Sequence, residues 1–231
     1  IGVSLDGLGE YQDNSRHFAN GKGSFDVVKK NLEFLFSNSI YPTIMTVVSD
    51  KNLDGLVELT KYLISNKLKF RYSFVQNEPI NIDKLITTLN ECYALMETAI
   101  ETEGYQFSSL HSLCDLQFSS VAFTSCGNGF STGALYPDGN LFFCQRNFGV
   151  DTPSGSIFED SDLLSIIQRK TYYKELPSDC ESCQYRYHCM GGCPLERGEG
   201  KDPHCEVYKL FFPVYYKLYA KERLMKIKNN L

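Results

Sequence analysis

The sequence predicts an α/β domain followed by a second domain that is rich in cysteine. Up to about residue 104, short β-rich runs alternate with segments of helical periodicity, which is the pattern of parallel strands joined by right-handed crossovers. After about residue 105, loops, glycines and cysteines dominate, and no helical period appears before the C-terminal segment. A chain of 231 residues with 42% hydrophobic side chains can bury a core in one large or two small domains. We therefore expect one domain over residues 1–105 and a second over residues 106–231.

Three βα units are expected in the first domain. Strands are predicted at residues 1–5, 43–48 and 69–75, and the middle one is almost continuously apolar, as in a strand buried on both faces. The first helix follows Ser24, a good N-cap, and the third begins at Asp83. Apolar residues recur at helical spacing at Val28, Leu32, Leu35 and Phe36, at Leu56, Leu59 and Leu63, and at Leu85, Leu89, Cys92 and Met96. Cys92 is thus interpreted as a core thiol. The three strands are interpreted as part of a larger barrel or sheet, because parallel sheets are normally covered and continued.

The carboxyl ends of these strands are the expected place for a ligand. Active sites of parallel α/β folds lie beyond those ends. Here they correspond to the loops Ser4–Asp6, Val48–Asn52 and Val75–Glu78.

Composition argues against several classes of partner. The net charge of −5 and the pI near 5.4 disfavour a nucleic-acid partner or an anionic membrane surface, since both need a basic face. The chain has neither an apolar run of about 18 residues nor an initial signal segment. We therefore expect no nucleic acid, no membrane and a cytoplasmic location. Ile1 opens the chain without methionine inside an apparent strand, which predicts further sequence upstream.

Two regular elements are expected in the second domain. The segment Gly133–Cys144 predicts a β-hairpin around the turn Pro137–Asn140. An aromatic helix is predicted from Glu206 to about Lys228, with a kink near Pro213.

Seven of the nine cysteines form one array in the second domain. The spacing is C-x17-C, with Gly139 five residues before the second cysteine, then C-x2-C-x5-C-x3-C, then C-x11-C. The members are Cys126, Cys144, Cys180, Cys183, Cys189, Cys193 and Cys205. One tetrahedral zinc or one four-iron cluster takes four thiolates, so seven ligands indicate two metal centres. Cys114 is the candidate for the eighth ligand.

Bound metal is favoured over disulfides for this array, and the metal is either zinc or the iron of iron–sulfur clusters. Disulfides are disfavoured because the cysteine count is odd and a C-x2-C pair in a reducing compartment usually holds metal. Zinc remains the alternative, although zinc ribbons usually show two closely spaced C-x2-C pairs and this chain shows one. Gly191 and Gly192 are expected to let backbone amides approach a cluster sulfur.

The array resembles the seven-cysteine signature of the SPASM domain, and the runs Cys126-Gly-Asn-Gly and Cys189-Met-Gly-Gly-Cys193-Pro are typical of it. Such domains extend radical S-adenosylmethionine enzymes that modify peptides and proteins. The resemblance implies that an outer auxiliary [4Fe-4S] cluster is held by Cys180, Cys183, Cys189 and Cys205, and an inner one by Cys126, Cys144 and Cys193. Some relatives complete the inner cluster with a further cysteine, but Cys114 lies farther upstream than that position.

The first domain resembles the second half of the partial (β/α)6 barrel of radical S-adenosylmethionine enzymes. The matching runs are Val3–Gly7, Asp13–Arg16, Gly21–Phe25 and Thr46–Asn52. The resemblance implies that Ser4 and Arg16 hold the methionine carboxylate of S-adenosylmethionine, since a hydroxyl and a guanidinium form a charge-assisted grip. The alternative is that Arg16 only tops a surface loop. Asp6 and Asn52 are further candidates for cofactor binding, and the alternative for Asn52 is a cap on the following helix.

Two departures from the family's pattern limit what the resemblance implies. The C-x3-C-x2-C loop that holds the catalytic cluster does not occur in this chain, so the chain alone is not expected to cleave S-adenosylmethionine. Truncation upstream or a natural degenerate homologue would account for this. Gln145 follows Cys144 where sulfatase-maturing relatives carry an aspartate proposed as the base, and glutamine cannot accept a proton at neutral pH.

The function expected from this resemblance is modification of a ribosomally made peptide through a 5′-deoxyadenosyl radical. The implied cofactors are S-adenosylmethionine and two auxiliary [4Fe-4S] clusters. The implied partners are a peptide or protein substrate and a reductant such as flavodoxin or ferredoxin. No catalytic residue is assigned. One alternative is an anaerobic sulfatase-maturing enzyme that makes formylglycine, and the other is a non-catalytic metal-binding or electron-transfer module.

Overall fold

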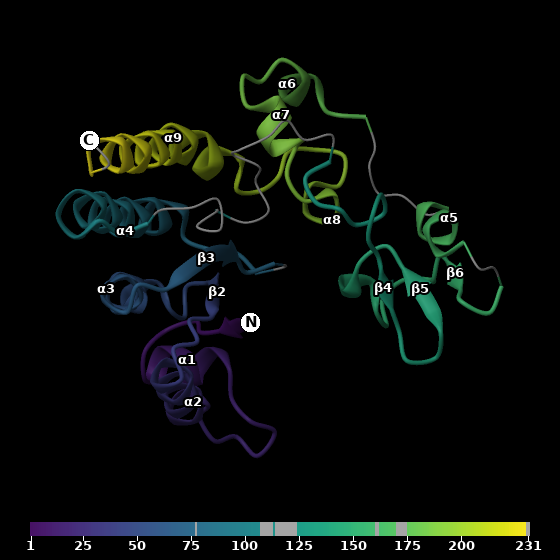
Figure 1. The fold of residues 1–231 in the computed structure, drawn as a ribbon. Helices are drawn as coiled ribbons and strands as arrows, with labels where there is room; N and C mark the ends of the chain where they lie inside the picture. Colours follow the sequence, from purple (N-terminus) through teal and green to yellow (C-terminus); the bar gives the residue numbers. More distant parts are fainter. Residues whose placement is uncertain (77, 107–112, 114–123, 160–161, 170–174, 230–231) are drawn as a thin grey trace. The chain divides into compact units, whose positions relative to one another are not determined.

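The computed structural model describes residues 1–231 except 77, 107–112, 114–123, 160–161, 170–174 and 230–231 (Figure 1). The chain divides into two compact units. Unit 1 contains Ile1–Cys114 and Glu206–Leu231, and unit 2 contains Asp115–Cys205. The C-terminal segment therefore belongs to the unit that contains the parallel sheet, whereas the sequence predicted it within the second domain.

A parallel sheet forms the centre of unit 1, with the strand order β1 (Gly2–Ser4), β2 (Thr43–Val48) and β3 (Lys69–Phe74). The three predicted strands and their parallel pairing are confirmed. Tyr72 of β3 also pairs in parallel with Leu113, so backbone pairing extends beyond β3, as expected for a sheet that is continued.

Helices connect these strands and cover the sheet in unit 1. Helix α1 (Glu10–Ser15) was not predicted, because six residues are too few to show a helical period. Helices α2 (Phe25–Ser37) and α3 (Leu56–Ser65) occur where expected, and a 3₁₀ turn, η1 (Leu53–Gly55), precedes α3. Helix α4 (Ile82–Glu103) begins one residue before the expected start.

The start and end of α4 have clear local causes. The Asn81 side chain accepts a hydrogen bond from the Lys84 amide at 3.0 Å, which satisfies one of the free amides of the first turn. Gly104 ends the helix in the left-handed conformation, at φ 63°.

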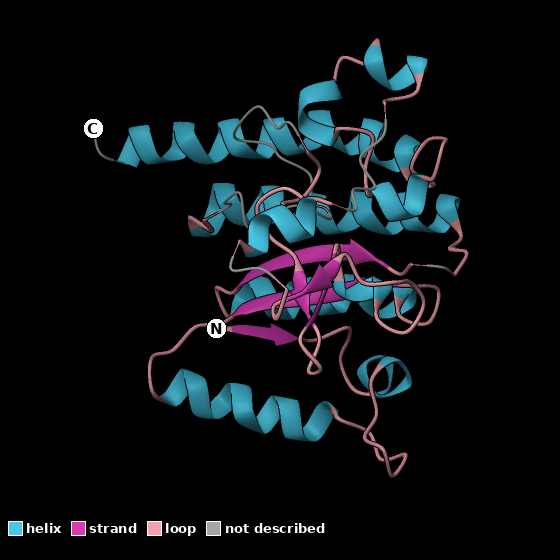
Figure 2. Ribbon diagram, turned by 90° about the vertical axis from the view of Figure 1, so that its right-hand side faces the viewer, coloured by secondary structure: helices cyan, strands magenta, loops and turns pink. Residues whose placement is uncertain are grey.

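The last helix, α9 (Cys205–Asn229), contains Pro213 and is continuous through it. Figures 1 and 2 show it beside α4. Tyr93 of α4 packs on Phe211, and Lys217 donates to Glu97 at 2.8 Å. No helix in the described part of the chain has the length and apolar character needed to cross a membrane.

The core of unit 1 is formed by apolar side chains from the strands and helices. Cys92 belongs to this core and accepts a hydrogen bond from Thr60 Oγ1 at 3.1 Å, so its interpretation as a core thiol is confirmed. The core includes Leu5, Ile44, Val48, Leu59, Leu63, Phe70, Tyr72, Leu85, Leu89 and Met96.

Unit 2 has a small antiparallel sheet of β4 (Ala134–Leu135), β5 (Asn140–Phe142) and β6 (Gly155–Ser156). Strands β4 and β5 flank a turn in which Gly139 has φ 89°, a conformation that favours glycine. Leu141 packs with Ile166 and Ile167 of α5 (Leu163–Gln168), which Figure 1 shows beside β5 and β6.

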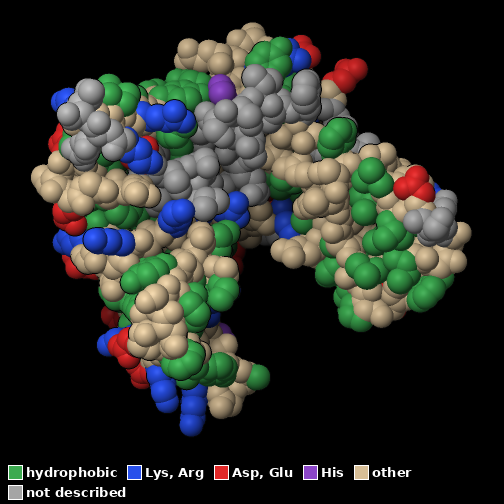
Figure 3. Space-filling model, viewed as in Figure 1, with side chains coloured by type: hydrophobic (Ala, Val, Ile, Leu, Met, Phe, Trp, Pro, Cys, Tyr) green, Lys and Arg blue, Asp and Glu red, His purple; other side chains and the backbone are tan. Residues whose placement is uncertain are grey.

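Short helices make up much of the rest of unit 2. They are η2 (Gln145–Asn147), α6 (Ser178–Glu181), α7 (Arg186–Cys189) and α8 (Pro194–Arg197). The expectation of no helix before the C-terminal segment is thus wrong, because one turn of helix leaves no readable period. Several apolar side chains of unit 2 stay exposed, among them Leu135, Val150 and Phe158. Figure 3 shows that hydrophobic side chains reach the surface of the chain in several places.

Candidate functional sites

Asp6 lies just beyond the carboxyl end of β1, and its carboxylate is occupied by protein donors. Oδ1 accepts from the Val47 amide at 2.8 Å, and Oδ2 accepts from Arg16 Nε at 2.6 Å. The Asp6 side chain is 4% exposed and that of Arg16 is 40% exposed. Asp6 therefore holds one edge of the guanidinium, while part of Arg16 remains open to a ligand.

Gln12 of α1 supports the same strand end and was missed by sequence reasoning. Its Oε1 accepts from the Asp6 amide at 2.7 Å, and its Nε2 donates to Ser24 Oγ at 3.0 Å. Ser24 Oγ donates in turn to the Arg16 carbonyl at 2.7 Å. A buried glutamine on a helix of six residues carries no local sequence signal, and only its partners reveal what it does.

Asn52 is fully buried and joins the ends of β1 and β2. Its Nδ2 donates to the carbonyls of Asp6 at 2.7 Å and Val47 at 2.8 Å, and its Oδ1 accepts from the Ser49 amide. Asn52 precedes η1 but makes no side-chain cap there, so the alternative of a helix cap is wrong. An amide side chain with all its polar atoms used in this way fixes the loop that follows β2.

The structure thus brings three of the four predicted cofactor-binding residues together: Asp6, Arg16 and Asn52. Ser4 ends β1 and is exposed, and within the described residues it makes no hydrogen bond to those side chains. Lys51 and Glu78 form an ion pair of 3.9 Å between the loops that follow β2 and β3. The predicted segment Val75–Glu78 is described except for residue 77.

In unit 2, Gly191 and Gly192 of the Cys189–Cys193 segment both have φ 76°, and the Gly192 amide donates to the Cys189 carbonyl at 2.9 Å. Burial raises the pKa of the Cys189 thiol to about 12, with Asp202 and Cys205 contributing to the rise, and the two glycine amides oppose it. A thiol in this setting carries no charge by itself at neutral pH, so a bound metal would be needed to hold it as a thiolate.

The Cys193 thiol lies close to a positively charged side chain. Burial raises its pKa, while the amides of Glu196 and Leu195 and the charge of Arg146 lower it. Arg146 Nη1 lies 3.8 Å from Cys193 Sγ, and the Cys193 amide donates to Asp202 Oδ2 at 3.1 Å.

Several of the thiols influence one another electrostatically. Electrostatic interactions join Cys180 to Cys183, Cys193 to Cys126 and Cys189 to Cys205. Each pair falls within one of the two ligand sets that the resemblance implies. Across the described residues, no three His, Cys, Asp or Glu side chains gather closely enough to hold a metal ion. Cys114 lies outside the described residues.

The donor chemistry of this region fits thiolate-held clusters. Cysteine thiolates can ligate the iron of a cluster, and a guanidinium near a ligand sulfur, as Arg146 is near Cys193, would stabilise the cluster's negative charge. Asn147 Oδ1 accepts from the Cys144 amide at 3.2 Å, which orients the hairpin cysteine. The assignment of individual cysteines to clusters stays a prediction.

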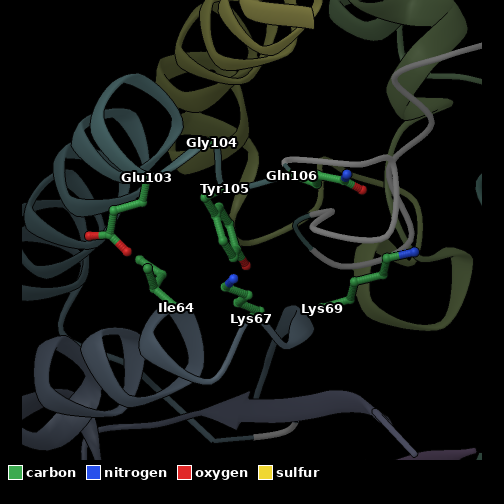
Figure 4. Close-up of a pocket in the computed structure, with 7 residues that line it drawn as sticks. All are labelled: Ile64, Lys67, Lys69, Glu103, Gly104, Tyr105 and Gln106. Carbon is green, nitrogen blue, oxygen red and sulfur yellow. The ribbon is translucent and has the colours of Figure 1, made fainter. Parts of the chain in front are cut away.

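A separate cavity of about 270 Å³ lies at the amino end of β3 (Figure 4). Lys67, Lys69, Glu103 and Tyr105 are among its lining residues. The Tyr105 hydroxyl donates to the Leu68 carbonyl at 2.8 Å. Among the described residues that line this cavity, none is a predicted site residue.

Comparison with known proteins places these features in context. No protein-family model matches the chain. The chain is 24% identical, over 92% of its length, to a cysteine-type anaerobic sulfatase-maturating enzyme from Clostridium novyi, of which it spans 63%. It is 22% identical, again over 92% of its length, to the serine-type enzyme from Klebsiella aerogenes, of which it spans 56%. The chain thus spans little more than half the length of these curated relatives.

Solved structures show the same fold. The whole chain superposes on 70% of anSMEcpe with bound AdoMet and the Cp18Cys peptide, with a TM-score of 0.67 and 18% identity. It covers 48% of Streptococcus suis SuiB bound to S-adenosylmethionine, over 83% of its own length, with a TM-score of 0.54 and 17% identity. The resemblance indicated by the cysteine array is therefore confirmed: the chain is similar, over nearly its whole length, to radical S-adenosylmethionine enzymes of the SPASM type, and it shares their fold.

Proposed function

We propose that this chain is part of a radical S-adenosylmethionine enzyme that modifies a ribosomally made peptide or protein. In this proposal, unit 1 is half of a partial (β/α)6 barrel and unit 2 is a SPASM domain that holds two auxiliary [4Fe-4S] clusters. The observation that carries the proposal is the array of seven cysteines within unit 2, together with the fold that the chain shares with these enzymes. Electrostatic effects on pKa link Cys180 with Cys183, Cys126 with Cys193 and Cys189 with Cys205, and each link falls within a single implied cluster.

The strand ends of unit 1 would bind the cofactor. Arg16 and Ser4 would hold the methionine carboxylate of S-adenosylmethionine, the guanidinium through the part that Asp6 leaves open. When bound beside a catalytic cluster, S-adenosylmethionine supplies the radical that takes a hydrogen from the substrate. Asp6 and Asn52 act as positioning residues here, because protein partners already occupy their polar side-chain atoms.

The clusters of unit 2 would accept an electron from the substrate or bind it, and a reductant such as flavodoxin or ferredoxin would serve the intact enzyme. The proposal of a peptide substrate draws on the relatives, since anSMEcpe is solved with the Cp18Cys peptide and SuiB with its precursor peptide SuiA.

Metal analysis after anaerobic reconstitution tests the proposal. About eight iron and a matching amount of sulfide per chain are expected for two four-iron clusters. About two zinc without sulfide would instead indicate a zinc-stabilised module and would overturn the proposal.

Two cysteine variants sharpen this test. Cys193→Ser should remove iron from one cluster and Cys205→Ser from the other. Cys92→Ala serves as the matched control, because that thiol lies in the apolar core of unit 1 and should leave the iron content unchanged. Equal loss of iron in all three variants would contradict the assignment.

Sulfatase maturation is the second candidate, favoured by the two curated relatives with that name. Gln145 argues against it, since this exposed side chain at the start of η2 offers an amide where a base is required. The intact enzyme should leave a sulfatase peptide unmodified, as judged by mass spectrometry. Formation of formylglycine would decide for the sulfatase maturase. An enzyme that takes up iron and sulfide but consumes no S-adenosylmethionine would support an electron-transfer module.

A further inference from the structure

Arg146 occupies an unusual position for a charged side chain in unit 2. It follows Cys144 by two residues, in the short helix η2, yet its guanidinium reaches a cysteine 47 residues away. Nη1 lies 3.8 Å from Cys193 Sγ, and Nη2 pairs with Glu196 Oε1. Both partners of this ion pair are largely buried, with side chains 21% and 11% exposed.

Glu196 determines how strongly the positive charge of Arg146 acts on the Cys193 sulfur. It is the third residue after Cys193, in α8, and its backbone amide donates to the Cys193 carbonyl at 3.0 Å. The carboxylate fixes the guanidinium and partly neutralises it. The Cys193 sulfur thus receives one partly compensated positive charge in a setting shielded from water.

We infer that Arg146 raises the reduction potential of the cluster that Cys193 holds, and that Glu196 limits this rise. The inference rests on the proposed function, because it requires a cluster at Cys193. A cluster that takes up one electron becomes more negative, so donors and positive charge at its ligand sulfur stabilise the reduced form. Arg146 is a positioning and tuning residue in this scheme.

The experiment uses the chain reconstituted with iron and sulfide under anaerobic conditions. Each cluster takes one electron from dithionite, and electron paramagnetic resonance follows the reduction of both clusters as the potential is lowered. Arg146→Gln should lower one of the two midpoint potentials by about 59 mV. For a one-electron couple, this shift changes the ratio of reduced to oxidised cluster at a fixed potential about tenfold. The other midpoint should not move.

Glu196→Gln should move the same midpoint in the opposite direction, because it leaves the guanidinium uncompensated. A purely structural role would not produce shifts of opposite sign. Arg169→Gln is the matched control, since Arg169 pairs with Glu159 on the surface of the same unit at 3.0 Å. It should leave both midpoints unchanged.

The possible failures can be told apart. A wild-type chain that takes up no iron and sulfide would overturn the proposed function. A loaded wild-type chain whose midpoints are unaffected by Arg146→Gln would overturn only the inference. If Arg146→Gln does not retain the cluster, Arg146→Lys replaces it in the test. Lysine keeps the positive charge but cannot contact Cys193 and Glu196 through two separate nitrogens. It should therefore lower the same midpoint potential, by less than the shift expected for Arg146→Gln. Loss of the cluster in both variants would make Arg146 a structural residue and would overturn the inference.

Discussion

The two units differ in the interactions that stabilise their folds. Unit 1 buries apolar side chains from three parallel strands and the helices around them, and its strand-end polar groups satisfy one another. In unit 2 the described residues show a small apolar cluster of Leu141, Ile166 and Ile167, and Phe142 and Phe143 are also buried. Small cysteine-rich units of this kind commonly take part of their stability from bound metal.

Metal removal should give the largest difference between the two units. Without metal, the free energy of opening that protects the amides of unit 2 from hydrogen exchange should fall by more than about 3 kcal/mol. The reason is that metal binding contributes directly to the folding free energy of such domains. Amides of β2 and α4 should keep their protection. Hydrogen exchange with mass spectrometry on loaded and chelated protein measures this. Equal loss in both units would contradict the comparison.

A core truncation in unit 1 should have the next largest effect. Leu59→Ala removes a fully buried side chain from α3 and should lower the free energy of unfolding of unit 1 by about 2–5 kcal/mol. Chemical denaturation followed by far-ultraviolet circular dichroism measures this. The iron content should not change, and the exposed Leu224→Ala provides the control. A parallel fall in iron content would show that the units do not behave independently.

A change at the strand-end network should affect cofactor affinity more than stability. Asp6→Asn replaces two carboxylate acceptors by one, so either the Val47 amide or Arg16 loses its partner. We expect an affinity for S-adenosylmethionine about tenfold weaker, which corresponds to about 1.4 kcal/mol. Equilibrium dialysis with the labelled cofactor measures it.

Asp54→Asn is the control for that experiment, since this exposed carboxylate pairs with Lys84 and, among the described residues, makes no ion pair with Arg16. An Asp6 variant that binds as tightly as this control would rule out a positioning role.

The smallest expected effect concerns the contact between α4 and α9. Hydrogen bonds from Lys217 and Lys221 lower the pKa of Glu97 below its ordinary value of 4.5. A carboxylate with a lowered pKa in the folded state stabilises the protein above the unfolded pKa, and this contribution is lost as the pH falls through the folded pKa. Glu97→Gln should therefore reduce stability at pH 7 by less than about 1 kcal/mol, since solvent screens the group.

The difference between wild type and Glu97→Gln should vanish under acidic conditions, well below pH 4.5. Thermal unfolding at a series of pH values measures it, with the exposed Glu58→Gln as the control. A difference in stability between the two proteins that stays constant down to the lowest pH measured would show that the effect does not come from ionisation of the Glu97 carboxyl group.

Periodicity explains why much of unit 1 could be predicted. The apolar run Thr43–Val48 and the helical stripe through Leu85, Leu89 and Met96 are local patterns, and each forms the element it predicts. Helix α1 lacks such a pattern, so Gln12 was not recognised, although it joins Asp6 to Ser24. The short helices of unit 2 were missed for the same reason.

The sequence by itself determined the three strands and the glycines beside Cys189, because each depends on residues close together in the chain, and the array of thiols could be recognised from its spacing alone. Only the tertiary structure decided which distant polar groups meet. Asp6 binds the amide of Val47 from another strand, and Arg146 reaches Cys193 across 47 residues. Such contacts join residues that are far apart in the sequence. They depend on the path of the backbone, which is set by the packing of the whole unit and is not encoded in local residue spacing.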